Sequence, residues 1–230
     1  MSTLWRWIPP ITADGTTQMN IDHQLFQQHC TGEQPPTLRF YTWHPVALSL
    51  GYHQKHYPKH WSELSWQGQK LDIVRRPTGG RAVLHQGDLT YMVVMSGERK
   101  QRQELYQEIC EFLRLGWAKL GISLNYGQAG RGYIHNPSCF GTATAADLVT
   151  PEGYKLIGSA QLRRGSSVLQ HGSMRLCPDA LLFEQVFGAS EGVGDYPMPY
   201  GVEEVITVLR EAAQEWFGGD WLTQEWQEFR

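Results

Sequence analysis

Apolar residues recur at helical spacing in four parts of the chain. The clearest case is Glu104–Leu120, where residues three and four apart form one apolar face: Leu105, Ile109, Phe112, Leu113, Gly116, Trp117 and Leu120. Similar spacing predicts helices over Asn20–Cys30 and Val202–Phe217, and Pro178-Asp179 is expected to begin a short helix that runs through Phe187. Cys110 lies beside the apolar face of the Glu104–Leu120 helix, so we expect a packing thiol.

Short apolar segments between turn residues predict strands. A first group comprises Leu38–Thr42, Val46–Leu50, Leu71–Val74, Ala82–Leu84 and Leu89–Met95. A second sheet region is expected from Asp147–Val149, Lys155–Leu162 and Val168–Leu176. Strands and helices do not alternate strictly, so the predicted class is α+β, as a single domain over residues 1–230.

Charge and composition exclude several classes of protein. The 20 basic and 23 acidic side chains give a net charge of −3, which argues against a nucleic-acid partner. No apolar run approaches the roughly 18 residues of a membrane span. The N-terminal residues do not resemble a signal peptide, so a cytoplasmic protein is expected. The four Cys form no CxxC pair and are expected to be thiols, and the nine His include no HExxH motif, so no metal site is expected.

A first candidate site is the segment from Arg75 to His85, with the sequence RRPTGGRAVLH. Adjacent glycines, here Gly79 and Gly80, let a backbone approach a ligand closely. The guanidinium groups of the flanking Arg75, Arg76 and Arg81 suit a phosphate or carboxylate. The alternative is a hairpin with solvated arginines, and the segment matches neither a P-loop nor a Rossmann fingerprint.

A second candidate is the strand that begins at Lys155. A lysine at the start of an apolar strand can act as a base or an activating cation if it is buried, and otherwise it is a strand-end lysine in water. The small residues Gly158, Ser159 and Ala160, followed by Gln161, leave space for a ligand chain against this strand.

Cys139 and His171 are the remaining candidates. Cys139 lies in a Gly/Pro-rich segment before Lys155. A nearby cation would lower a thiol pKa from its usual value of about 8.5 and favour the thiolate, although few cysteines are catalytic without other support. His171 and Gly172 lie in Gln170–Ser173, and a lone histidine is more often structural than functional.

Three ordered blocks resemble the biotin/lipoate protein ligase (BPL/LPL) family, and within it the octanoyltransferase branch called LipM. They read RRPTGGRAVLHQGDLTYMVV from Arg75, SCF from Ser138, and KLIGSAQLRRGSSVLQHGS from Lys155, with further support from Leu38–Tyr52. The family's ligases typically have a third glycine where this chain has Arg81, and they generally lack Cys139. The amidotransferase branch LipL keeps the cysteine but not the QHGS stretch. Two departures from the usual pattern are His85-Gln86-Gly87-Asp88 and Phe140-Gly141-Thr142.

The resemblance implies a mixed, largely antiparallel sheet flanked by helices, like the catalytic core of class II aminoacyl-tRNA synthetases, with an apolar acyl tunnel. It also implies an octanoyltransferase that needs no cofactor. The donor would be octanoyl-acyl carrier protein, and the acceptor a lysine in the lipoyl domain of H protein or of a dehydrogenase E2. Membrane and nucleic-acid partners are not expected.

The same resemblance assigns roles to the candidate residues. Cys139 would form the acyl thioester, and Lys155 would hold the thiolate and later accept a proton. Gly79, Gly80 and His85 would line the tunnel, with backbone amides near Gly158 as an oxyanion hole. Arg75 and Arg76 would meet the phosphopantetheine or the carrier surface. The further substrate-binding candidates are Arg81, Ser159, Ala160, Gln161, His171 and Gly172.

Three alternatives remain open: an ATP-dependent lipoate ligase, a LipL-like amidotransferase, and a carrier-binding module without activity.

Overall fold

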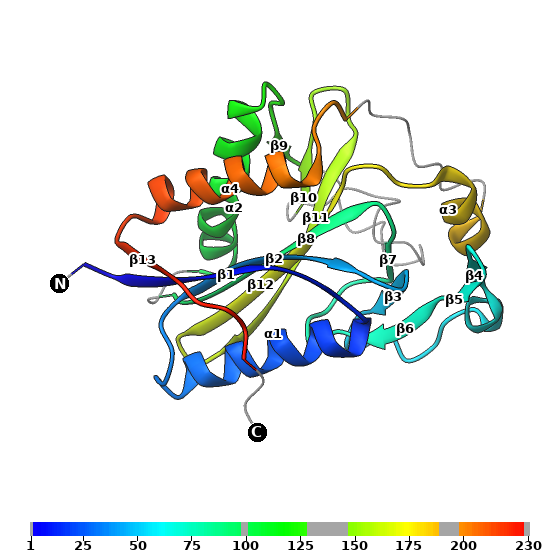
Figure 1. Cartoon of the computed structure of the whole chain (residues 1–230), viewed down its shortest axis with the longest axis horizontal. Helices are drawn as coiled ribbons and strands as arrows, with labels where there is room; N and C mark the ends of the chain where they lie inside the picture. The colour runs from blue at the N-terminus through cyan, green and yellow to red at the C-terminus, as the bar shows by residue number, and fades with distance from the viewer. Residues whose placement is uncertain (1, 98–100, 128–146, 189–197, 228–230) are drawn as a thin grey trace.

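A mixed sheet of eight strands forms the centre of the molecule (Figure 1). The computed structural model describes residues 2–97, 101–127, 147–188 and 198–227. The order across the sheet is β13-β1-β2-β8-β12-β11-β10-β9. The bounds are β1 Leu4–Ala13, β2 Thr37–Trp43, β8 Asp88–Ser96, β9 Asn125–Tyr126, β10 Asp147–Val149, β11 Lys155–Arg164, β12 Ser167–Arg175 and β13 Asp220–Thr223.

Most neighbouring strands in this sheet are antiparallel. Only the pairs of β1 with β13 and with β2 are parallel. β12 pairs with β8 along its whole length, from Ser167 opposite Ser96 to Arg175 opposite Asp88. The predicted α+β class with a mixed, largely antiparallel sheet is therefore confirmed. The expectation of a second sheet region was wrong, because β12 joins β10 and β11 to the same sheet as β2 and β8.

A smaller sheet lies beside the first, with the order β6-β3-β7. Its strands are β3 Ala47–Leu50, β6 Asp72–Arg75 and β7 Val83–His85. Because β3 separates β6 from β7, the segment between Arg75 and His85 is a connection across β3, and the hairpin alternative was wrong. A 3-10 turn over Lys59–Glu63 and the two-stranded pair β4 Ser65–Trp66 and β5 Gln69–Lys70 follow β3 along the chain.

Helices cover both faces of the large sheet (Figure 1). They are α1 Gly15–Cys30, α2 Arg102–Lys119 and α4 Val202–Phe217, whereas α3 Ala180–Phe187 packs against the smaller sheet. The helix α1 covers one face, and α2 and α4 pack together over the other. The Asp14 and Asp179 side chains accept hydrogen bonds from backbone N–H groups at the starts of α1 and α3. All four predicted helices are confirmed, although α1 begins earlier than the apolar pattern indicated.

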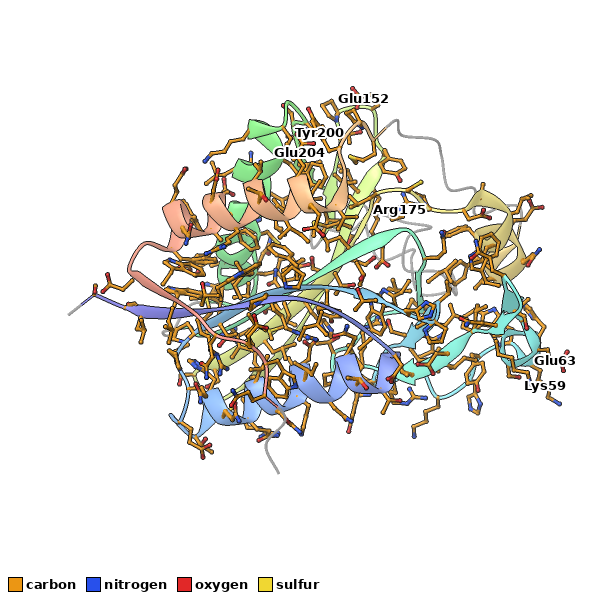
Figure 2. All side chains as sticks on the ribbon, viewed as in Figure 1. Lys59, Glu63, Glu152, Arg175, Tyr200 and Glu204 are labelled. Carbon is orange, nitrogen blue, oxygen red and sulfur yellow. The ribbon has the colours of Figure 1, made fainter. Side chains whose placement is uncertain are left out.

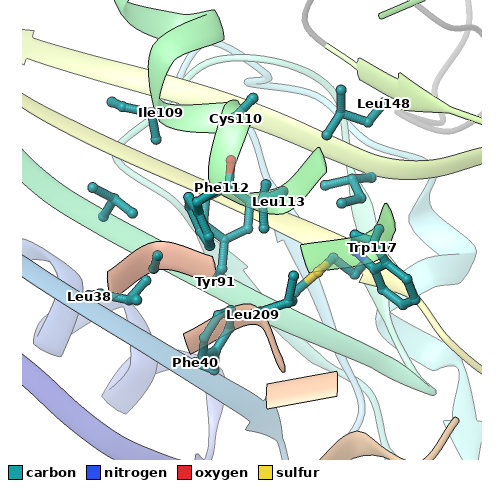
Figure 3. Close-up of a cluster of buried hydrophobic side chains, with 14 of the residues drawn as sticks. Leu38, Phe40, Tyr91, Ile109, Cys110, Phe112, Leu113, Trp117, Leu148 and Leu209 are labelled. Carbon is teal, nitrogen blue, oxygen red and sulfur yellow. The ribbon is translucent and has the colours of Figure 1, made fainter. Parts of the chain in front are cut away.

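The largest hydrophobic cluster lies between the sheet and the α2–α4 pair (Figure 3). It contains the predicted apolar face of α2, together with Leu38 and Phe40 of β2 and Leu209 of α4. Cys110 is fully buried in this cluster, and burial raises the pKa of its thiol to about 12. It is therefore the packing thiol that its place in the helix predicted.

Three strands of the large sheet were not predicted from the sequence: β1 and β13 on one side, and β9 at the other edge. The segment of β1 contains Pro9-Pro10, which argues against a strand, but the register with β2 shifts between Ile8 and Ile11 and so accommodates both prolines. The short strand β13 pairs only with β1, from the far end of the chain. No helix within the described ranges is long and apolar enough to cross a membrane.

Candidate functional site

A cavity of about 50 Å³ lies where α1, the large sheet and the segment after β6 meet. Since one water needs roughly 10–15 Å³ of such space, the cavity holds several water-sized groups. Eight of the predicted substrate-binding residues line it: Arg76, Gly80, His85, Gly158, Ser159, Ala160, His171 and Gly172. The remaining lining residues were not predicted: Met19, Tyr41, Trp43, Ser49, Val83, Thr90 and Ser173.

The guanidinium of Arg76 holds the glycine segment in place. It donates to the carbonyl oxygens of Ser49 at 2.7 Å, Gly79 at 2.8 Å and Arg81 at 2.6 Å, and its side chain is only 5% exposed. Arg76 therefore points inward, which corrects the expectation that it meets a carrier surface. Arg75 is exposed, and its guanidinium donates to the carbonyl of Gly51.

Gly51, which follows β3, and Gly80 lie where the two backbones come into close contact. A Cβ on Gly51 would lie 1.9 Å from the carbonyl oxygen of Gly80, and Gly80 itself has φ +94°. Side chains at either position would push the segment away from β3. Gly51 and Gly80 thus allow this segment to pack closely at the cavity wall. Gly79 contributes a carbonyl to Arg76 and, like Arg81, does not line the cavity.

His171 is buried and bonded at both ring nitrogens. Its Nδ1 lies 2.8 Å from Asp22 Oδ2, and its Nε2 lies 2.6 Å from the hydroxyl of Thr78, which precedes the glycines. Burial lowers the pKa of His171, so the ring is neutral at pH 7. A neutral ring that donates from Nδ1 to Asp22 can accept from Thr78, and it thereby ties the glycine segment to β12 and α1.

Asp22 links this histidine to a buried arginine. Burial alone would raise the pKa of Asp22, but Arg39, whose Nη2 lies 2.7 Å from Oδ1, and the hydrogen bond with His171 lower it overall. Tyr41 donates a further hydrogen bond to Asp22 at 2.9 Å. The carboxylate is therefore ionised and multiply bonded beneath the cavity.

His85 occupies a second buried network that also lines the cavity. Its Nδ1 lies 2.8 Å from Asp88 Oδ2, and its Nε2 lies 2.8 Å from the hydroxyl of Ser49. The ring stacks on Trp43 with centroids 3.9 Å apart. Ser173 also donates to Asp88, at 2.6 Å. These bonds fix the orientation of His85, which faces the cavity as the sequence predicted.

Lys155 is buried next to the cavity rather than solvated at the end of a strand. Its ammonium lies 2.9 Å from Asp147 Oδ2, and the two side chains are 5% and 4% exposed. Asp147 is paired across the strands with Gly158, which lines the cavity. The structure thus provides a held cation beside the small residues of β11, and the alternative of a solvated lysine was wrong.

Several predicted residues lie elsewhere. Cys139 is outside the described residues, as is the departure at Phe140-Gly141-Thr142. Gln161 faces away from the cavity, because it pairs with Gln170 and its amide donates to that side chain at 2.7 Å. Gly158 is paired with β10 on one side and β12 on the other, so its N–H faces a paired strand and is not a free oxyanion donor.

Gln86 and Gly87, where the sequence differs from the usual family pattern, have a structural role. The Gln86 side chain accepts a hydrogen bond from the backbone N–H of Asp179 at 2.5 Å, just before α3. Gly87 has φ +63°, and a Cβ there would lie 1.8 Å from the carbonyl oxygen of Cys177. These two residues dock the chain that follows β12 against the start of β8.

Most residues that sequence reasoning missed are partners of predicted ones. Asp22 and Thr78 are 149 and 93 residues from His171 in the sequence, so no local pattern connects them. Asp147 pairs across the strands with Gly158 and not with Lys155, so predicting the two strands did not indicate their ion pair either. Within the described ranges, no three His, Cys, Asp or Glu side chains are grouped as a metal site.

The sequence matches the family model of the lipoyl protein ligase A/B catalytic domain over residues 14–228. The chain belongs to this family. The family resemblance noted from the three sequence blocks is therefore confirmed, and the matched range includes every residue of the cavity wall.

Within the family, the chain is similar in sequence to several curated octanoyltransferases. It is 38% identical to octanoyltransferase LipM of Brevibacillus brevis over 89% of this chain and 78% of that protein. It is 39% identical to octanoyltransferase LipM of Symbiobacterium thermophilum over 92% of this chain and 80% of that protein. A solved lipoate-protein ligase A bound with ATP superposes with a TM-score of 0.76 over 99% of this chain and 90% of its own, at 20% identity. That similarity establishes the fold, whereas the octanoyltransferase relatives confirm the predicted acyltransferase class.

Proposed function

We propose that this family member transfers an octanoyl group from a thioester carrier to a lysine of a lipoyl domain, through a thioester on Cys139. The observation that carries the proposal is the buried ion pair of Lys155 with Asp147, placed beside the cavity by the pairing of Asp147 with Gly158. A fixed cation at this point suits a reaction in which thiolates form in both steps, first on the carrier and then on Cys139. The octanoyltransferase relatives support the same chemistry.

The cavity suits the acyl chain. Carbon atoms of Met19, Tyr41, Trp43 and Val83 contribute to its wall. Each methylene or methyl group of the acyl chain that the cavity buries contributes about 0.8 kcal/mol before the costs of binding. Gly158, Ala160 and Gly172 leave the chain room to lie against the sheet. The carbonyl carbon would then emerge near Gly158, on the side of Lys155.

The first half-reaction exchanges one thioester for another. The Cys139 thiolate attacks the octanoyl carbonyl, the bond from carbon to the carrier's sulfur breaks, and the departing thiolate takes a proton from the Lys155 ammonium. Thioester exchange is nearly isoenergetic, so no ATP is needed. Asp147 keeps Lys155 in place while the proton leaves.

The second half-reaction forms the amide. The neutral amine of the acceptor lysine attacks the octanoyl-Cys139 carbonyl, the carbon–sulfur bond breaks, and the surplus proton on nitrogen passes to Lys155. This step restores both the Cys139 thiolate and the Lys155 ammonium, so the proton count closes over one turnover. Covalent catalysis thus divides one acyl transfer into two steps.

The acceptor is proposed to be a lipoyl domain. A protein of similar fold belongs to an archaeal lipoylation system from Thermoplasma acidophilum, made of a bipartite lipoate protein ligase and its E2 lipoyl domain, and it superposes with a TM-score of 0.70. An acyl carrier protein is the proposed donor, because it presents the octanoyl group as a thioester. Both partners must reach the carbonyl end of the cavity.

The proposal is tested by measuring modification of an apo lipoyl domain by mass spectrometry. Octanoyl carrier protein is supplied without ATP in one arm, and free octanoate or lipoate with ATP in the other. Transfer from the carrier without ATP supports the proposal. Modification that occurs only with ATP and a free acid would make the chain a ligase and would overturn it.

A further inference from the structure

The pairing of β10 with β11 contains a bulge next to Lys155. Asp147 pairs with Gly158 and Leu148 with Ile157, but Val149 pairs with Lys155. Leu156 is therefore left without a partner on β10. One extra residue in one strand of an antiparallel pair is the defining feature of a β-bulge, and bulges are common where a strand must redirect a side chain.

This bulge decides which face of the sheet Lys155 occupies. Opposed residues of antiparallel strands point to the same face, and residues two apart on one strand do so too. Val149 shares a face with Asp147, so Lys155 lies on the face of Asp147 and Gly158. In an unbroken strand, Lys155 would share the face of Ile157 instead. Leu156 and Ile157 both lie in the α2–α4 cluster, as expected if the extra residue interrupts the alternation.

The bulge is held by Arg175, the last residue of β12, which is labelled in Figure 2. Its Nε and Nη2 donate to the carbonyl oxygen of Lys155 at 3.0 and 2.7 Å. The side chain is only 7% exposed, and its guanidinium lies over the ring of Tyr154 at 4.4 Å. Two donors on one carbonyl fix both the position and the tilt of the peptide that carries Lys155.

We propose that Arg175 is a positioning residue for the acyl transfer, because it clamps the bulge that turns the Lys155 ammonium toward Asp147 and the cavity. The inference rests on the role of Lys155 in the proposed function. The charged groups around Lys155 come from three strands. Asp147 lies on β10, Arg175 on β12, and Asp88 on β8, where Asp88 is the residue opposite Arg175. Arg175 acts through Lys155 and does not itself touch the acyl group.

The test measures octanoyl transfer by the full chain with Arg175→Met, Arg175→Lys and Lys155→Met. Misplacing a reacting group by about 1 Å can cost about 100-fold, so Arg175→Met is expected to lower kcat by roughly 10- to 100-fold. KM for the donor should change little, because the cavity wall is intact. Arg175→Lys should recover part of the rate, since an ammonium can donate to the same carbonyl.

The pH profile separates positioning from a loss of folding. If the Lys155 ammonium is misplaced, the Cys139 thiolate is less favoured relative to the thiol. The acidic limb of the pH–rate profile should therefore move to higher pH in Arg175→Met. Arg6→Met is the matched control, because Arg6 is also a buried arginine, at 3% exposure, but lies on β1 and bonds Thr37. It should lower stability and leave the pH profile unchanged.

Three outcomes are distinct. A shifted limb in Arg175→Met and no shift in Arg6→Met supports the inference. If Lys155→Met abolishes transfer but Arg175→Met retains the wild-type kcat and profile, the positioning role is overturned while the proposed function stands. If Lys155→Met itself transfers at the wild-type rate, the role of Lys155 and the inference that depends on it are both overturned.

Discussion

At the scale of single residues, the site contains two buried ion pairs. Lys155 with Asp147 and Asp22 with Arg39 are ion pairs whose side chains are almost fully buried. Such pairs contribute little to stability, because the cost of removing both charges from water offsets their attraction. Their burial beside the cavity therefore favours a functional role over a stabilising one, and for Lys155 the proposed role is proton and thiolate handling.

The first residue-scale prediction separates stability from activity at the ion pair. Asp147→Asn leaves the Lys155 ammonium buried without its carboxylate, so the free energy of unfolding should fall by about 3–5 kcal/mol. Asp147→Leu combined with Lys155→Met should be more stable than Asp147→Asn in urea unfolding, yet inactive in transfer. A double variant that transfers octanoyl groups at the wild-type rate would contradict the catalytic role of the pair.

The second residue-scale prediction concerns pH and His171. Burial holds the pKa of His171 below the usual histidine value of 6.5, so below that pH the unfolded chain binds a proton that the folded chain does not. Stability is therefore lost as pH falls through the window below 6.5, by at most about 1.4 kcal/mol per pH unit for this one group. In His171→Asn, urea midpoints at pH 7.5 and 5.5 should differ less than in wild type. An unchanged difference would mean that His171 titrates normally.

At the scale of elements, the accuracy of sequence reasoning depended on whether the decisive contacts were local. The helices α2 and α4 were predicted almost to the residue, because an apolar face buried against one sheet imposes a 3.6-residue period. The strand β1 was missed because its Pro9-Pro10 is tolerated only through a register shift with β2. The bulge at Lys155 was equally hidden, because it exists only in the pairing of two strands.

A prediction at this scale concerns the docking of the chain after β12 against Gly87. Gly165→Ala is a matched control, since Gly165 also has positive φ but would meet nothing within 4 Å. The left-handed conformation alone costs an alanine about 1–2 kcal/mol. Gly87→Ala should cost clearly more, because the new Cβ meets the carbonyl of Cys177. Equal losses for the two variants in urea unfolding would show that this contact relaxes freely.

At the scale of the whole molecule, two groups of arginines could meet an acidic carrier protein, and they lie far apart. Arg75 lies at the end of β6 beside the glycine segment, whereas Arg163 and Arg164 end β11. Arg164 is roughly 20 Å along that strand from Gly158, at about 3.3 Å per residue. Because the net charge is −3, binding of an acidic carrier depends on local positive charge, and the exposed Arg75 lies next to the segment that lines the cavity.

Reversing the charge of Arg75 or of Arg164 tests where the carrier binds. Exposed ionic contacts contribute about 0.2–1 kcal/mol, so Arg75→Glu should raise KM for the carrier by roughly two- to fivefold at low salt. The effect should shrink as salt is added, since exposed charges are screened. Arg164→Glu, with its exposed side chain at the far end of β11, should leave KM unchanged. A larger effect at Arg164 would place the carrier at the opposite end of the sheet.

The large-scale arrangement was only partly predictable. Every strand of the second predicted group exists, but the long pairing of β12 with β8 joins them to the first, and no local signal specifies that pairing. The cavity brings together eight predicted residues because two of the sequence blocks meet there, one as the segment after β6 and the other as β11 and β12. Its supporting partners, Asp22, Thr78 and Ser49, come from elements whose positions only the fold reveals.

The central claim, an octanoyl thioester on Cys139, is tested most directly by intact-mass spectrometry of the protein after it is mixed with octanoyl carrier protein in the absence of ATP. We predict a mass increase of one octanoyl group on the wild-type chain, its absence in Cys139→Ala, and its loss from the wild type when an apo lipoyl domain is added and becomes octanoylated. An unmodified wild-type chain, together with undiminished transfer by Cys139→Ala, would contradict the thioester mechanism.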